Sequence, residues 1–465
     1  MPPEKSAYAL ARYSRSADSI RQSIDWVRSH NSQNFLESFY FQYGHQSIAD
    51  LGHTVLCFEG ISELAASEIE DETLWDGQAK SSRYQDFSKA GFITPPELSG
   101  AAAERFKAAG EALLRAYAAV HARVNEYLTA QLPRPESMKP DAYARNIAAR
   151  AFDVARYLLF WGVPTNVGQV TSIRTLEKQI KRLRISEFRE VRELGDEIAQ
   201  ACAEVPGCTW NDGNEGKAEP IAPTLARHAE ADEHQRRARE DLKLWALENL
   251  TVAPFDVARV DLLKPDDVLT EIAATLLYPV CDHPFRAIYE TARTWSQALK
   301  AEVLEVAVQS RGSRDDLVRG FRGGQYCFDM LIDIGAYRDL HRHRRCHQYR
   351  QAYTGQHGYD IPELLRLSGT DAEYRVAMDA AMETMRQLPD PARQYLLPFG
   401  ARSRFLFKMD FAEVEYISRV RSGVKGHFSY REIAWEMKQR VEEIEPELAK
   451  LIDATPPWVE DPLKR

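Results

Sequence analysis

Apolar residues recur every three or four positions along much of the chain, the spacing that lines one face of an α-helix. A shorter helix is predicted where Ile334, Tyr337 and Leu340 recur. The β-branched and aromatic run over residues 54–59 predicts a strand. The longer helices are predicted over residues 8–30, 62–72, 101–131, 140–159, 172–183, 186–205, 228–250, 265–275 and 284–308.

Several short segments occur twice, in the same order. Residues 206–225 are rich in Gly, Pro and Asn, as linkers are, and they separate the two sets. The pattern predicts an α+β chain of two tandem domains, 1–205 and 226–465. Each domain would be a mixed or antiparallel sheet flanked by long helices, and together they would form a pseudo-dimer. The matching pairs are Ala155-Arg156 with Ala392-Arg393, Arg182-Leu183-Arg184 with Arg419-Val420-Arg421, and Cys57-Phe58-Glu59 with Cys327-Phe328-Asp329.

Composition narrows the function classes. The 465 residues carry a net charge of −9 and are 44% hydrophobic, which is typical of a globular protein and disfavours a nucleic-acid partner. No apolar run is long enough to span a membrane, so no membrane partner is expected. The six cysteines include no CxxC pair and are interpreted as reduced thiols of a cytoplasmic protein.

The strongest chemical signal is the segment 341–350, which holds three histidines and four arginines in an acidic chain. Guanidinium groups suit phosphate and carboxylate oxygens, so an anionic ligand is expected. A solvated basic helix face is an alternative. Zinc binding by His343 and His347, with Cys346 beside them, is another. The neighbouring arginines would lower the pKa of the Cys346 thiol.

These residues resemble the flavin-dependent thymidylate synthases, whose signature is RHRxxSxNxxSxRY. The second copy keeps Arg342-His343-Arg344 and loses the residues that follow. The first copy keeps Ser81, Arg83 and Tyr84 but replaces Arg-His-Arg with Asp71-Glu72-Thr73. Ala392-Arg393 resembles the family's "ARxxLP" segment, and Arg421 falls where the family has an arginine against the pyrimidine ring.

The resemblance implies an enzyme that uses FAD, NADPH and methylenetetrahydrofolate to methylate C5 of dUMP, without a metal and without a protein thiol. Arg342, His343 and Arg344 would bind the flavin. Arg342, His343 and Arg421 would be catalytic. The substrate-binding residues would be Ser81 and Arg83 at the phosphate and Arg393 and Arg421 at the uracil and ribose.

Because each copy keeps a different half of the signature, the surviving halves are expected to form one composite site per chain. Two chains would then form a homodimer that resembles the family's tetramer. Two alternatives stay open. The chain could bind a flavin or nucleotide without methylating it, or it could modify C5 of a different uridine nucleotide, by methylation or hydroxymethylation.

Overall fold

The computed structural model describes residues 1–30, 32–42, 46–206, 219–233, 236, 258–263, 267–277, 291–308, 321 and 326–463. The predicted linker and the predicted helices over 228–250 and 284–308 lie partly outside these residues. Within the described part, no helix is long and apolar enough to cross a membrane.

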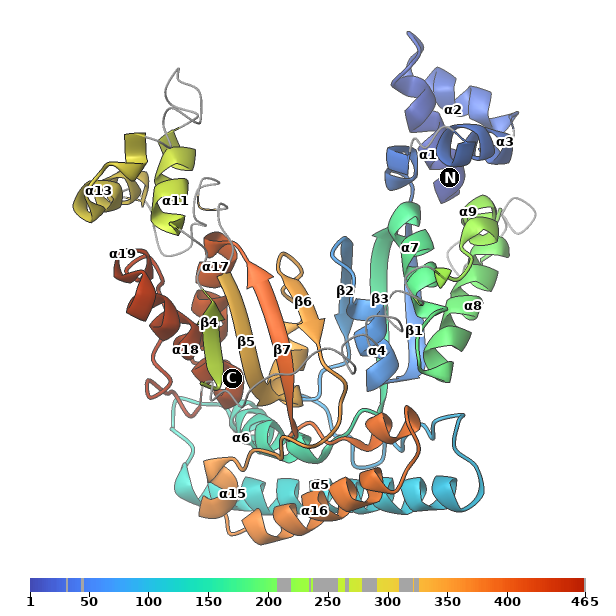
Figure 1. Ribbon diagram of the computed structural model, residues 1–465. Helices are drawn as coiled ribbons and strands as arrows, with labels where there is room; N and C mark the ends of the chain where they lie inside the picture. The colour runs from blue at the N-terminus through green and yellow to red at the C-terminus, as the bar shows by residue number, and fades with distance from the viewer. Residues whose placement is uncertain are drawn as a thin grey trace, which may run out of the picture.

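The strands form two antiparallel sheets, which confirms a mixed fold of helices and antiparallel strands (Figure 1). The first sheet has the order β1-β3-β2 and the second the order β4-β5-β7-β6. The predicted strand 54–59 lies within β1. The bounds are His53–Ser62 for β1, Trp75–Ala79 for β2, Pro164–Ser172 for β3, Val260–Leu263 for β4, Tyr326–Asp333 for β5, His347–Arg350 for β6 and Arg402–Met409 for β7.

Equivalent helices follow the corresponding strands of the two sheets. Helix α4 (Glu63–Glu70) follows β1, while α7 (Ile173–Leu183) and α8 (Arg189–Ala203) follow β3. In the second sheet, α14 (Ile334–Leu340) follows β5, while α17 (Phe411–Ser422) and α18 (Phe428–Ile444) follow β7. The first helix after each long strand begins at a side chain that accepts a backbone hydrogen bond and satisfies a free N–H group. These caps are Ser62, Ser172, Asp333 and Asp410.

Helix α5 (Gly100–Gln131) runs beneath both sheets with α16 (Asp371–Arg386) alongside it, and α6 (Pro140–Ala155) and α15 (Glu363–Leu367) lie below the second sheet (Figure 1). The predicted helix 101–131 is therefore confirmed as α5. The predicted helix 140–159 ends earlier, because α6 gives way to the 3-10 helix η3 (Arg156–Leu158).

Two buried loops join the halves above these helices. Phe160 pairs with Pro398 in an antiparallel bridge. The Gly162 N–H donates to the Tyr395 carbonyl at 2.8 Å, and the Phe399 N–H donates to the Leu159 carbonyl at 2.7 Å. Apolar side chains from both halves belong to one continuous core around this junction. Burial of this apolar surface fixes the two sheets relative to each other.

The single helix predicted over residues 8–30 is wrong. The structure has α1 (Pro3–Tyr13) and α2 (Ile20–Arg28), separated by a turn. Ser19 begins α2 through a capping box with Gln22, which makes the break favourable. The remaining elements are α3 (Ser32–Leu36), η1 (Glu37–Gln42), η2 (Gln46–Leu51), α9 (Pro223–His228), α11 (Val268–Leu277), α13 (Gln297–Val308), η7 (Ala392–Leu396) and α19 (Pro446–Ala449).

Candidate functional site

The basic loop, residues 341–346, leaves the end of α14 and leads into β6. The loop is not helical, and its side chains are not uniformly solvated, because His341 and His343 are buried while Arg342 and Arg345 are exposed. The zinc alternative also fails in its geometry. Because α14 ends at Leu340 and His347 begins β6, His343 and His347 do not share a helix face. Across the described residues, no group of three metal-ligating side chains occurs.

A cavity of about 360 Å³ lies between the basic loop and α17, and we call it the α17 cavity. The structure thereby brings Arg342, His343, Arg344 and Arg421 together. The lining residues are Arg342, His343, Arg344, Arg345, Ala412, Glu413, Glu415, Tyr416, Val420 and Arg421.

His343 is held between two side chains of α17. Its Nε2 accepts a hydrogen bond from the Arg421 Nε at 2.7 Å, and its Nδ1 lies 3.4 Å from the Glu413 Oε1. Burial lowers the pKa of His343, and the charge of Arg421 lowers it further. The imidazole is therefore neutral near pH 7. The positive charge of the cavity comes from its arginines.

Arg342 and Arg344 have donors to offer a ligand. The Arg344 Nη2 donates to Asp76 at 2.9 Å, and its guanidinium lies 5.2 Å from the centre of the Trp75 ring. Its Nη1 is buried and has no hydrogen-bond partner in the described part of the chain. Arg342 is exposed and makes no side-chain hydrogen bond or ion pair with the described residues. An acceptor-rich, electron-rich ligand fits such donors.

The two separated halves of the signature meet in a second, smaller pocket. Ser81, Arg83 and Arg342 line it together with Arg156 and Asp339, and we call it the composite pocket. Its volume of about 20 Å³ has room for roughly one water molecule. The predicted neighbours are therefore close together, but the pocket is closed by its own side chains.

Arg83 is saturated by partners from both halves. Its Nε and Nη2 donate to the two oxygens of Asp153 at 2.7 and 3.2 Å. Its Nη1 donates to the Tyr430 hydroxyl at 3.0 Å, and its Nη2 also donates to the Lys425 carbonyl at 3.2 Å. Although burial opposes the charge, Asp153 raises the pKa of Arg83, so the guanidinium stays ionised. Arg421 lies over the same Tyr430 ring, 5.5 Å from its centre.

Arg156 is a site residue that the sequence interpretation missed. Its Nη1 and Nη2 each donate to the Asp339 Oδ2 at 3.1 Å. Although burial opposes ionisation of Asp339, Arg156 and then Arg83 hold the pKa of this carboxyl below its usual value. Arg393, by contrast, pairs with Asp390 at 2.6 Å and lines neither pocket. The repeated Ala-Arg pair was the available signal, since Ala155-Arg156 matches Ala392-Arg393.

The segment that replaces Arg-His-Arg in the first copy also faces the basic loop. Asp71, Glu72 and Thr73 line a pocket of about 170 Å³ opposite His341 and Arg344. The Glu72 carboxylate pairs with Arg182 at 2.9 Å. This pocket is rich in carboxylates and would repel an anionic ligand.

Cys346 lines that pocket from the basic loop, and its thiol is buried. The thiol donates to the His343 carbonyl at 2.9 Å. Burial raises the pKa of Cys346 to about 12. The expectation that adjacent arginines lower this pKa is therefore wrong, because desolvation outweighs them.

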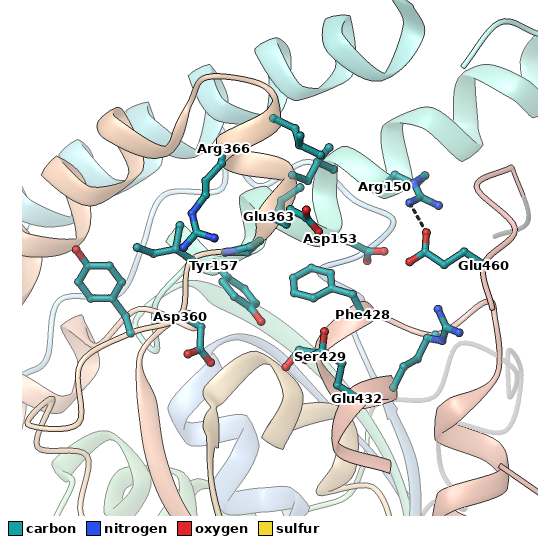
Figure 2. Close-up of a pocket in the computed structure, with 18 of the residues that line it drawn as sticks. Arg150, Asp153, Tyr157, Asp360, Glu363, Arg366, Phe428, Ser429, Glu432 and Glu460 are labelled. Carbon is teal, nitrogen blue, oxygen red and sulfur yellow. Dashed lines mark ion pairs between the residues drawn. The ribbon is translucent and has the colours of Figure 1, made fainter. Parts of the chain in front are cut away.

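A larger cavity of about 630 Å³ lies on the other side of Asp153 (Figure 2). Asp153 projects from α6 and Tyr157 from η3, while Phe428, Ser429 and Glu432 project from the start of α18 (Figure 2). Arginines and carboxylates alternate around its wall, so neither charge dominates. None of the predicted site residues lines it.

Comparisons with known proteins give a consistent family. The family model described as "Thymidylate synthase complementing protein" matches residues 1–206 and 277–447. A protein of Chlamydia muridarum named "UPF0159 protein" is 29% identical over 87% of this chain and 77% of its own length. The protein "UPF0159 protein Ta1429" of Thermoplasma acidophilum is 24% identical over 95% of this chain and 93% of its own length.

Among solved structures, one similar chain is described as flavin dependent thymidylate synthase ThyX from Helicobacter pylori, complexed with FAD and dUMP. The match has a TM-score of 0.31 and 11% sequence identity, and it covers 42% of this chain and 98% of the other.

Proposed function

Because the chain belongs to the thymidylate synthase complementing protein family, we propose that it is a flavin-dependent enzyme that methylates C5 of dUMP or of a related uridine compound. Methylenetetrahydrofolate would donate the carbon and NADPH the hydride. FAD would bind in the α17 cavity, against Arg342, Arg344 and Arg421.

The observation that carries this proposal is the unused donor capacity of the α17 cavity. The buried Arg344 Nη1 has no partner among the described residues, and Arg342 is unpaired there. A flavin ring presents carbonyl and ring-nitrogen acceptors, and it is anionic when reduced, so guanidinium groups suit it. Bound FAD would supply the hydride chemistry that the side chains lack.

The chain's own residues would orient and stabilise the reactants. Arg342, Arg344 and Arg421 place fixed positive charge where negative charge develops. His343, being neutral, would hold Arg421 through a hydrogen bond and add no charge of its own. No protein thiol acts as a nucleophile in this proposal. This agrees with the raised pKa of Cys346, because a protonated thiol is a poor nucleophile.

We place the nucleotide at the composite pocket, with Ser81 and Arg83 on its phosphate side. There we propose Arg156 in place of Arg393, since Arg156 lines this pocket. A phosphate would have to displace Asp153 from Arg83 and Asp339 from Arg156. Substrate binding is therefore coupled to a rearrangement of these ion pairs.

A second candidate function is a flavin-binding protein that does not methylate. The observation in its favour is the same pair of carboxylates, because Asp153 and Asp339 already neutralise the two arginines that would meet the phosphate. The α17 cavity would then bind FAD while the composite pocket served only to join the halves.

Titrating purified chain with FAD tests the first part, and adding dUMP, methylenetetrahydrofolate and NADPH tests the second. We expect about one FAD per chain and formation of dTMP. Arg344→Ala should weaken FAD binding about tenfold, the scale of a charge-assisted hydrogen bond. Arg366→Gln, in the cavity of Figure 2, is the matched control and should bind FAD normally. FAD binding without dTMP would favour the second candidate, and absence of FAD binding would contradict both.

A further inference from the structure

Glu413 is a buried carboxylate that neither the resemblance nor the repeat singles out. It lies in the first turn of α17, 3% exposed, and its backbone N–H donates to the capping Asp410 at 2.9 Å. Its Oε1 lies 3.4 Å from the His343 Nδ1. The other ring nitrogen of His343 meets Arg421 at 2.7 Å, on the last turn of the same helix.

We propose that Glu413 is a positioning residue, which fixes His343 as the neutral Nδ1–H tautomer and thereby holds Arg421 toward the α17 cavity. The tautomer follows from the partners. A guanidinium has donors and no acceptor, so the His343 Nε2 beside Arg421 must carry the lone pair. A neutral imidazole carries a single N–H hydrogen, so the Nδ1, which lies beside the Glu413 carboxyl oxygen, must carry it.

The reverse tautomer would be unfavourable at both contacts. It would point an N–H group at the Arg421 Nε–H and a lone pair at the Glu413 oxygen, with both contacts out of water. Buried polar groups without partners are costly. Removing Glu413 would leave the His343 Nδ1–H without an acceptor. The Nδ1–H tautomer would then be less favoured over the Nε2–H tautomer. Arg421 would then lose its acceptor.

The charges around His343 come from every element packed against it. Glu413 and Asp339, from α17 and α14, favour the imidazolium, whereas burial and Arg421 oppose it. Arg342 and Arg344 flank it in the basic loop, and the Tyr416 ring meets it edge-on at 5.7 Å. Since burial lowers the pKa of His343, the neutral form predominates near pH 7, as the tautomer argument requires.

In the proposed enzyme, this arrangement would decide where Arg421 presents its charge. The Arg421 Nε is used by His343 and its guanidinium is stacked over Tyr430, so only the two Nη groups remain for a ligand. Glu413 would therefore act on the ligand through two intervening side chains. This consequence rests on the proposed function, whereas the tautomer of His343 does not.

The test uses full-length chain with ¹⁵N-labelled histidine and needs no ligand. The His343 signals are identified by their absence in His343→Gln. In wild type and Glu413→Gln, which keeps an acceptor oxygen, we expect a protonated Nδ1 and a bare Nε2 at pH 7. Glu413→Ala should show the Nε2–H tautomer or a mixture. Glu177→Ala, which removes a buried carboxylate from α7, is the control and should leave His343 unchanged.

FAD binding supplies a second measurement on the same proteins. Glu413→Ala should weaken FAD binding about tenfold, Glu413→Gln less than about threefold, and Glu177→Ala not at all. An imidazolium or an Nε2–H tautomer in wild type would overturn the inference, as would an unchanged His343 in folded Glu413→Ala. If wild type binds no FAD but shows the expected tautomer, the proposed function fails and the inference about Glu413 stands.

Discussion

The arginines in and around the basic loop differ in how many of their hydrogen-bond donors are still free to bind a ligand. Arg83 pairs with the buried Asp153 and Arg156 with the partly buried Asp339, and the donors of both arginines are largely used. Arg342 and Arg344 retain free donors, since Arg342 has no partner among the described residues and the Arg344 Nη1 is unsatisfied. The residue type alone does not distinguish these four arginines. Their partners do: Arg83 and Arg156 connect the two halves of the chain, whereas Arg342 and Arg344 have donors left for a ligand.

Asp333 is a buried carboxyl that makes stability depend on pH. It caps α14 and accepts a hydrogen bond from Ser429, and burial raises its pKa to about 6. The folded state therefore binds more protons than the unfolded state between the usual value near 4 and about pH 6. This contribution is fully present below pH 4 and is lost as the pH rises through about 6.

Asp333→Asn should therefore flatten the dependence of stability on pH between 4 and 7, since Asn still caps the helix and does not titrate. The free energy of unfolding, measured by urea denaturation at several pH values, checks this. Asp141→Asn, an exposed acid in the first turn of α6, is the control and should keep the wild-type slope. An unchanged slope in Asp333→Asn would show that this carboxyl is ionised like an ordinary one.

At the residue scale, the sequence points to side chains that the structure brings together, but it does not show which partners they have. The sequence singled out Arg342, His343 and Arg421, and all three line the α17 cavity. The resemblance assigned Arg393 to the substrate, whereas Arg156 is the arginine that lines the composite pocket. The repeat alone does not show which of the two copies faces the basic loop. It also could not show that Glu413 meets His343, since that contact depends on how α17 packs.

At the scale of elements, the basic loop faces a short acidic loop, residues 71–74, and the start of β2, which follows that loop. Strands β2 and β6, which follow these loops, lie on the inner sides of the two sheets (Figure 1). The Asp76 side chain is 86% exposed and pairs with Arg344. An exposed pair of this kind contributes little to stability. It does, however, compete for an arginine that we assign to the flavin.

Asp76→Asn should therefore tighten FAD binding by about two- to fivefold at low salt and leave thermal stability nearly unchanged. The gain should shrink at high salt, because exposed charges are screened. Fluorescence titration of FAD at two ionic strengths checks this. Asp25→Asn removes a similarly exposed ion pair, with Arg28, and serves as the control. Weaker FAD binding by Asp76→Asn would mean that Asp76 positions Arg344 productively.

Helices were easier to predict than strands for a physical reason. The long α5 buries a regular apolar face that includes Phe106, Leu113 and Tyr117. Strand β3 buries Thr165, Gln169 and Thr171 besides Val167, so its inward side carries little hydrophobic alternation. Its buried amide is satisfied by a partner on α7, Gln179, at 2.9 Å, which the local sequence does not reveal. β7, by contrast, alternates regularly between buried and partly exposed positions, as a strand with one face in the core does.

At the scale of the whole molecule, the repeat in the sequence corresponds to two sheets in which β1, β3 and β2 are matched by β5, β7 and β6. The second sheet also has β4, which has no counterpart in the described part of the first sheet. We propose that the chain is a pseudo-dimer, whose halves meet at the buried loops around Phe160 and Pro398. Repetition predicts that two similar units exist. It does not predict their contact, because the pairing of these loops depends on three-dimensional fit between distant segments.

The composite pocket leads to a prediction about stoichiometry. Arg83 comes from the first half and Arg342 from the second, and both line this pocket within one chain. Each chain should therefore hold one FAD and one nucleotide. At an FAD concentration near the wild-type Kd, chains carrying Arg83→Lys should lose dTMP formation and chains carrying Arg344→Ala should lose most of it. Mixing them should restore none, because each chain would lack one side of its only site. Lysine keeps the charge and loses the two-pronged contact with Asp153.

Thermal unfolding of both variants must first show that they are folded, because Arg83 joins the halves through Tyr430 and Lys425. Breaking a buried ion pair typically costs about 3–5 kcal/mol, and Arg83→Lys keeps part of that interaction. Recovery of activity on mixing would mean that the working site forms between chains. Two FAD molecules per chain would mean that the carboxylate-lined pocket at Asp71 and Glu72 binds flavin despite its charge. Either result would contradict a single site built from both halves of one chain.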